Sequence, residues 1–231
     1  MLRIPAWLTV PHLQRRSHEQ AFFASISRGF GISISQYGAP STRPGTLFIM
    51  NHISWADIPV MMAILDADFV AKSDMLGWPV IGALARRFDP VFVARDNRHR
   101  SHAQADAIRA RLCSGRSVIL CPEGTTSNGT SILPFRTSLF EAADAAAAVQ
   151  PVTLRYLMLD GAALAAERQR EVAWIEEDDL VTGAARLSKI KTLARVEFLP
   201  PVSGRTDRKI LAENIRQNML AAYAAAPNRS I

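Results

Sequence analysis

Cysteine and long apolar runs are scarce in this chain of 231 residues. No stretch approaches the roughly 18 apolar residues that a membrane-spanning helix needs. The segment from residue 1 to 10 is interrupted by Arg3 and Pro5, which makes it a poor secretory signal. The two cysteines, Cys113 and Cys121, lack the spacing of metal ligands. We therefore expect a reduced, cytosolic setting, no metal site and no bound cofactor.

Lysine is also rare, since 23 of the 27 basic residues are arginine. The net charge is +6, and the excess lies in the first half of the chain. Residues 1–120 carry 14 basic and 8 acidic side chains, whereas residues 121–231 carry 13 of each. Arginine suits planar contacts with phosphate or carboxylate, although an arginine-rich codon usage gives the same composition. Nothing in this scattered charge matches a nucleic-acid-binding motif, so nucleic acid is not an expected partner.

The amino-terminal region combines aromatic residues and arginines, and Glu19 is the one acidic residue among the first 35. This composition favours the headgroup layer of an anionic membrane. We predict an amphipathic, membrane-associating segment over residues 1–40 and a second domain over residues 41–231. The alternative for the first segment is an ordinary helix that packs on the domain.

From residue 46 onward, short β-rich runs alternate with helix-like runs. This alternation predicts an α/β fold with a mostly parallel central sheet flanked by helices. The predicted strands are 46–50, 68–72, 90–94, 117–121, 149–157 and 192–199, and the predicted helices are 55–65, 79–87, 99–114, 137–148 and 206–226.

Three polar residues each follow a predicted strand: His52, Arg95 and Glu123. Sites in sheets of this kind gather at the carboxyl ends of the strands. We therefore expect these residues to lie along one edge of the sheet.

The segment Asn-His-Ile-Ser-Trp-Ala-Asp, residues 51–57, separates His52 from Asp57 by four residues. A carboxylate that accepts the imidazole N–H fixes the tautomer and leaves the other ring nitrogen free to take a proton from a hydroxyl. The alternative is that Asp57 only caps a helix, since Ser54 and Asp57 have the spacing of a capping box.

Four segments in this order and spacing resemble the glycerolipid acyltransferase family, which includes bacterial 1-acylglycerol-3-phosphate acyltransferase. They are Asn51-His52-x4-Asp57, then Phe69 to Lys72 with Pro79, Gly82 and Phe92 to Arg95, then Pro122-Glu123-Gly124-Thr125, and Val149 to Val152. The resemblance implies an α/β fold, His52 as the general base and Asp57 as its orienting carboxylate. It also implies substrate-binding roles for Lys72, Arg95, Glu123, Gly124, Thr125, Thr126 and Arg136.

One position departs from the pattern of the phosphate-acceptor members. They often carry arginine after Pro-Glu-Gly-Thr, whereas Thr126 stands here, and threonine lacks the forked donors that bind phosphate. Either Arg136 supplies the charge or the acceptor carries another head group. The latter possibility resembles lyso-ornithine-lipid acyltransferases.

The expected function is an O-acyltransferase for lipid biosynthesis that works at the cytoplasmic face of the inner membrane, as a peripheral or monotopic protein. Its partners would be acyl-CoA or acyl carrier protein as thioester donor, a lysolipid acceptor and anionic membrane lipids. The first expected acceptor is 1-acylglycerol-3-phosphate, which gives phosphatidic acid; lyso-ornithine lipid is the alternative. A thioesterase is a more distant alternative. The chain has no Gly-x-Ser-x-Gly elbow, so we expect no covalent acyl-enzyme in the transfer.

Overall fold

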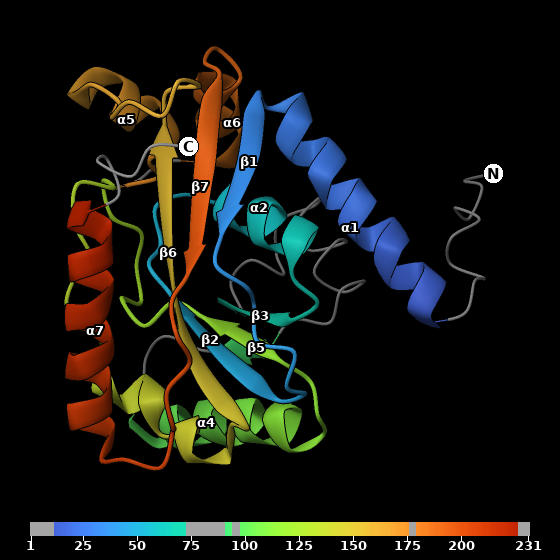
Figure 1. Ribbon diagram of the computed structural model, residues 1–231, viewed down its shortest axis with the longest axis vertical. Helices are drawn as coiled ribbons and strands as arrows, with labels where there is room; N and C mark the ends of the chain where they lie inside the picture. Colours follow the sequence, from blue (N-terminus) through green and yellow to red (C-terminus); the bar gives the residue numbers. More distant parts are fainter. Residues whose placement is uncertain (1–11, 73–90, 94–97, 176–178, 226–231) are drawn as a thin grey trace.

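A seven-stranded sheet organises the part of the chain that the computed structural model describes, which is residues 12–72, 91–93, 98–175 and 179–225. The strand order is β1-β7-β6-β2-β5-β3-β4 (Figure 1). Their bounds are β1 Ile32–Tyr37, β2 Thr46–Met50, β3 Asp68–Lys72, β4 Val91–Val93, β5 Val118–Leu120, β6 Ala148–Leu157 and β7 Thr192–Phe198. All neighbouring strands are parallel except β6 and β7. The predicted α/β class with a mostly parallel sheet is confirmed.

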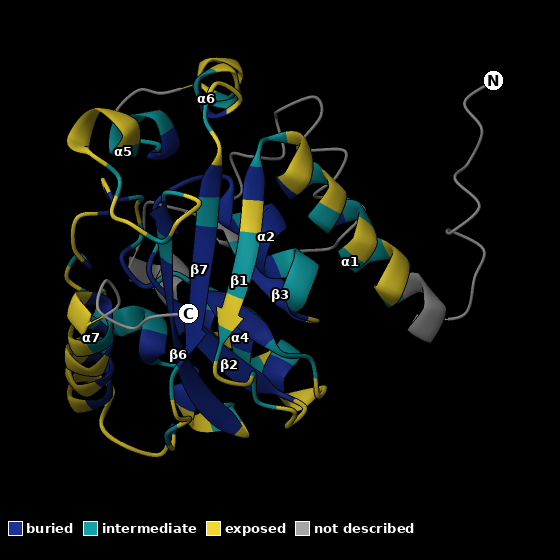
Figure 2. Ribbon diagram, turned by 45° about the horizontal axis from the view of Figure 1, so that its top comes forward, coloured by how far each residue is buried: buried dark blue, intermediate teal, exposed yellow. Residues whose placement is uncertain are grey.

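Helices cover both faces of this sheet, and Figure 1 shows α7 and α1 on opposite sides of the molecule. The bounds are α1 His12–Gly29, α2 Asp57–Ile64, α4 Arg98–Cys113, α5 Ala166–Val172, α6 Leu180–Leu187 and α7 Arg208–Ala225. Side chains of successive residues point to opposite faces of a strand. In β2, Phe48 and Met50 therefore join the core under α2, while Leu47 and Ile49 join the core under α4 and α7. Figure 2 shows the resulting buried interior of the sheet between helices with exposed outer faces.

The predicted strands lie where the structure has them, to within two residues at either end. Strands with both faces buried appear in the sequence as short continuous apolar runs, so their position is easy to predict. The prediction missed β1, whose sequence Ile-Ser-Ile-Ser-Gln-Tyr is short and half polar. It pairs in parallel with β7 at the edge of the sheet.

Three of the predicted helices correspond to α2, α4 and α7, and the predicted helix at 79–87 lies outside the described residues. The helix predicted over residues 137–148 is wrong. The chain there forms two short 3₁₀ turns, η3 Thr137–Phe140 and η4 Ala143–Ala145, and then enters β6. Alanine favours a helix only weakly compared with tertiary contacts. The Ala147 N–H donates to the carbonyl of Gly45, which draws this segment into the sheet instead.

The helix α1 confirms a helical segment near the amino end, and it packs against α2. Phe30, just after α1, meets the ring of Trp55 edge to face with a centroid distance of 4.9 Å. In the described parts of the chain, no helix combines the length and the apolar character that crossing a bilayer requires.

Candidate active site

The turn between β2 and α2 brings His52 and Asp57 together. The imidazole Nδ1 lies 2.7 Å from Asp57 Oδ2, with the carboxylate fully buried and the His52 side chain 23% exposed. An ionised carboxylate only accepts hydrogen bonds, so Nδ1 carries the proton and Nε2 presents a lone pair. Among the described residues, none is a hydrogen-bond partner of Nε2. The pair therefore has the geometry of an oriented general base at the carboxyl end of β2.

Asp57 also fixes the turn that leads into α2. Its Oδ2 accepts the backbone N–H groups of Ile53 at 2.7 Å and Ser54 at 3.1 Å. The N-cap of α2 is Ala56, and no side chain caps the helix. Asp57 therefore does more than the alternative allowed, because one carboxylate holds both the local backbone and the imidazole. Its second oxygen, Oδ1, accepts the phenol O–H of Tyr156 in β6 at 2.8 Å.

The Pro-Glu-Gly-Thr loop, residues 122–125, holds the backbone of His52. Glu123 Oε1 accepts the His52 N–H at 2.8 Å, and Oε2 accepts the Leu133 N–H at 3.0 Å. The His52 carbonyl in turn accepts the Ser127 N–H at 2.8 Å. Burial raises the pKa of Glu123 to about 7, although the two N–H donors lower it. This glutamate is therefore buried and holds the backbone of His52. Its predicted role in substrate binding stays a prediction.

The remainder of this loop carries the other candidate residues that follow β5. Gly124 has a φ of +69°, and the Arg136 side chain lies so close over it that an added Cβ would be 2.6 Å from Nε. Arg136 and Thr125 are exposed. The Thr126 hydroxyl donates to the carbonyl of Trp174, before α6, so it is engaged in a contact within the protein. The structure thus places the Arg136 side chain over Gly124, and it turns Thr126 toward Trp174.

Two of the predicted binding residues cannot be placed. Arg95 lies outside the described residues, and so does the side chain of Lys72, whose backbone closes β3.

Sequence reasoning missed three groups that position the pair: the side chains of Asn51 and Tyr156 and the backbone N–H of Ser127. Asn51 Nδ2 donates to the Leu154 carbonyl at 2.9 Å, and its Oδ1 accepts the Leu154 N–H at 2.8 Å. These bonds continue the pairing of β2 with β6 past Met50. Alternation along the predicted strand 149–157 offered a signal, since it places Tyr156 on the same face as Leu154.

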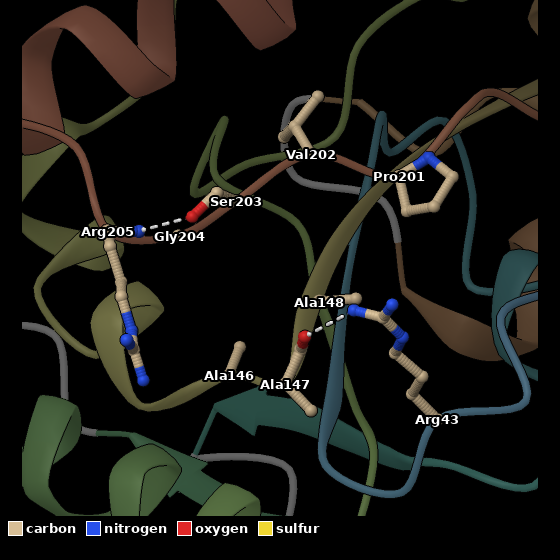
Figure 3. Close-up of a pocket in the computed structure, with 9 residues that line it drawn as sticks. All are labelled: Arg43, Ala146, Ala147, Ala148, Pro201, Val202, Ser203, Gly204 and Arg205. Atoms are coloured by element: carbon tan, nitrogen blue, oxygen red, sulfur yellow. Dashed lines mark hydrogen bonds between the residues drawn. The ribbon is translucent and has the colours of Figure 1, made fainter.

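A separate hollow lies at the opposite end of β6 (Figure 3). It has a volume of about 480 Å³ and is lined by Ala146 to Ala148 and by Pro201 to Arg205, with Arg43 across from them. Ala148 and Tyr156 are about 26 Å apart along the strand, at ~3.3 Å per residue. This hollow is therefore distinct from the His52 site, and no titratable group of that site reaches it.

A histidine whose Nδ1 is held by a buried carboxylate, at the carboxyl edge of an α/β sheet, has the geometry expected of a general base. The Acyltransferase family model matches residues 33–155. The chain belongs to this family, and it is an acyltransferase.

Similar proteins support the same assignment. A lyso-ornithine lipid O-acyltransferase of Brucella abortus is 35% identical over 216 residues, covering 89% of this chain and 81% of the relative. A 1-acyl-sn-glycerol-3-phosphate acyltransferase of Neisseria meningitidis is 33% identical over 190 residues, covering 80% and 72%. The crystal structure of the 1-acyl-sn-glycerophosphate acyltransferase PlsC from Thermotoga maritima has the same fold, with a TM-score of 0.69, 18% identity and coverage of 95% and 82%.

Proposed function

We propose that the protein moves a fatty acyl group from a thioester of coenzyme A or acyl carrier protein to the free hydroxyl of a lysolipid. The observation that carries this proposal is the His52–Asp57 pair, with Nδ1 held by a buried carboxylate and Nε2 without a partner among the described residues. Names of similar proteins agree, since both sequence relatives act on lysolipids by name.

The proposed reaction follows from the proton that His52 can accept and the positive charge that Asp57 can stabilise. His52 Nε2 takes the proton of the lysolipid hydroxyl as its oxygen attacks the thioester carbonyl carbon, and Asp57 stabilises the imidazolium that forms. The C–O bond forms, the C–S bond breaks, and the imidazolium returns its proton to the departing thiolate. General-base help of this kind contributes about 10²–10⁴-fold to the rate. No acyl-enzyme is needed, because the alcohol attacks the donor directly.

The test compares purified wild-type protein with His52→Ala and His18→Ala. Wild-type protein should convert acyl-CoA and lysolipid to diacylated product, and His52→Ala should lose about 10³-fold or more in kcat because the base is gone. His18 is an exposed histidine on α1, so its replacement should leave the rate unchanged. Full activity of His52→Ala would refute the assigned base.

Water could take the place of the lipid alcohol, which would make the enzyme a thioesterase. The two reactions differ in a measurable product, since a thioesterase releases free fatty acid when no acceptor is present. We expect acyl transfer to exceed hydrolysis, and dominant hydrolysis with both substrates present would overturn the proposal.

For the acceptor, Thr126 favours lyso-ornithine lipid over 1-acylglycerol-3-phosphate. Threonine has no forked cation that could bind a doubly charged phosphate. The Thr126 hydroxyl, moreover, already donates to the carbonyl of Trp174. The exposed guanidinium of Arg136, over Gly124, pairs equally well with the carboxylate of an amino-acid head group and with a phosphate, so position 126 alone carries the preference. The two acceptors should be supplied side by side to the purified enzyme. Exclusive use of the phosphate acceptor would remove the lyso-ornithine lipid candidate.

We further propose that the enzyme works on the cytoplasmic face of the inner membrane, attached at the surface by the part of residues 1–40 that precedes β1, since β1 belongs to the sheet. The support is the arginine-rich and aromatic composition of that segment, which suits anionic headgroups.

A further inference from the structure

Tyr156 holds the one oxygen of Asp57 that faces away from His52. The phenol is 2% exposed, and its O–H donates to Oδ1 at 2.8 Å. The other oxygen, Oδ2, accepts three donors, which are His52 Nδ1 and the N–H groups of Ile53 and Ser54. A buried carboxylate is stabilised by each donor it accepts, so Tyr156 shares in the charge that otherwise acts on the imidazole.

The strand β6 presents this phenol independently of the turn that carries the pair. Asn51 fixes β6 beside His52 through two hydrogen bonds with the Leu154 backbone. Tyr156 follows two residues later on the same face of the strand. The sheet therefore fixes the position of the Tyr156 hydroxyl, whereas Asp57 belongs to α2. The hydrogen bond between them joins β6 to α2 next to His52.

We propose that Tyr156 is a positioning residue that sets the basicity of the His52–Asp57 pair by withdrawing negative charge from Asp57 Oδ1. This role rests on the proposed function of His52 as general base. Without the phenol hydroxyl, the carboxylate charge concentrates on the His52 side and stabilises the imidazolium. The neutral imidazole, which is the active form, then appears at a higher pH.

Other titratable groups also face the pair. Glu123 and Cys121 approach from the loop after β5, and Tyr223 approaches from α7. The pKa of Glu123, about 7, falls in the range where the pH profile is read. Asp57 raises the pKa of each of these three groups. The titration of the His52 imidazole itself, followed by NMR, is therefore needed beside the pH profile of the rate.

The decisive variant is Tyr156→Phe, which keeps the ring and deletes only the hydroxyl. We expect the acidic limb of the pH profile of kcat/KM to move up by about half a pH unit. The result is an about threefold loss one pH unit below the wild-type midpoint. KM for both substrates should stay unchanged, because the phenol is buried and its hydroxyl is bonded to Asp57.

Tyr223→Phe is the matched control. Tyr223 is also buried, and its O–H donates to the Gly129 carbonyl at 2.7 Å. Tyr223 faces the pair but makes no hydrogen bond to Asp57. Thermal stability should therefore fall similarly in both variants, while Tyr156→Phe moves the acidic limb further than Tyr223→Phe does. An unmoved limb in Tyr156→Phe, with the same loss of stability as the control, would show a merely structural role.

A second measurement strengthens the hydrogen bond that the Tyr156 phenol donates, instead of removing it. The chain has three tyrosines, and replacing them all with fluorotyrosine makes each phenol a stronger donor. The limb should then move to lower pH, and this shift should vanish in the Tyr156→Phe background. The imidazole titration followed by NMR, with His52→Asn to assign the signal, needs no substrate. It therefore tests Tyr156 even if lysolipid acylation itself is not observed, and an unchanged titration in Tyr156→Phe would overturn the inference.

Discussion

Glu123 shows how a single residue links the site to the stability of the protein. Burial raises its pKa to about 7 from an ordinary 4.5, against the opposing effect of the His52 and Leu133 N–H donors. The folded protein therefore binds this proton more tightly than the unfolded chain between those two pH values. For an acid with a raised pKa, stability is highest at low pH and is lost as the pH rises toward about 7.

We predict that Glu123→Gln removes this pH dependence. Integrating the raised pKa gives an upper bound of about 3 kcal/mol lost by the wild type between pH 4.5 and 7. Urea unfolding at several pH values measures it. Glutamine has one acceptor oxygen, so either His52 or Leu133 loses its partner, and kcat should also fall about tenfold.

Glu213→Gln, an exposed position on α7, serves as the control and should keep the wild-type slope. Parallel stability curves for wild-type protein and Glu123→Gln would show that Glu123 does not carry the raised pKa.

At the scale of elements, the connections between strands depend on close backbone approaches. Gly38 follows β1 with a φ of +68°, and an added Cβ would lie 2.3 Å from the Phe198 carbonyl oxygen at the end of β7. Gly161, after β6, has a φ of +86° and no neighbouring atom within 4 Å of such a Cβ. Both glycines have a left-handed backbone, but only Gly38 would also bring an added Cβ into overlap, so comparing them separates backbone strain from steric overlap.

We predict that Gly161→Ala costs about 1–2 kcal/mol of unfolding free energy from the left-handed backbone alone. Gly38→Ala should cost about 2 kcal/mol more, because the main chains of β1 and β7 must also move apart. Chemical denaturation of both variants measures the difference. Equal losses would mean that the turn after β1 relaxes freely.

Which elements and contacts could be predicted from sequence depends on how far apart the interacting residues lie along the chain. Apolar runs such as residues 47–50 and 118–120 identify strands because both of their faces are buried. His52 and Asp57 are close in sequence, so their spacing alone suggested a pair. Tyr156 lies 99 positions from Asp57, and only the folded sheet brings it to the carboxylate. The Ala-rich segment 137–148 was mispredicted for the same reason, since its partner Gly45 is remote in sequence.

At the scale of the whole molecule, α1 joins the amino-terminal region to the part that carries the base. It packs against α2, the helix that begins with Asp57. An ion pair between Arg16 and Asp66 connects α1 to the segment between α2 and β3. Arg16, near the start of α1, thus meets the segment that enters β3, whereas Phe30, just after the end of α1, meets Trp55 in the turn between His52 and Asp57. A membrane contact made ahead of α1 would therefore connect to the His52 site through the whole length of α1.

This arrangement predicts that residues 1–11 contribute to membrane binding. They include Arg3 and Trp7, and a basic residue near an anionic surface contributes about 1 kcal/mol, with further affinity from the apolar side chains. Deleting residues 1–11 should therefore weaken binding to phosphatidylserine vesicles at least about tenfold in sedimentation assays. Deletion of residues 226–231 is the matched control, and circular dichroism should show both truncated proteins folded. Binding of the full chain should weaken with salt, whereas equal affinity of both truncated proteins would place the membrane contact elsewhere.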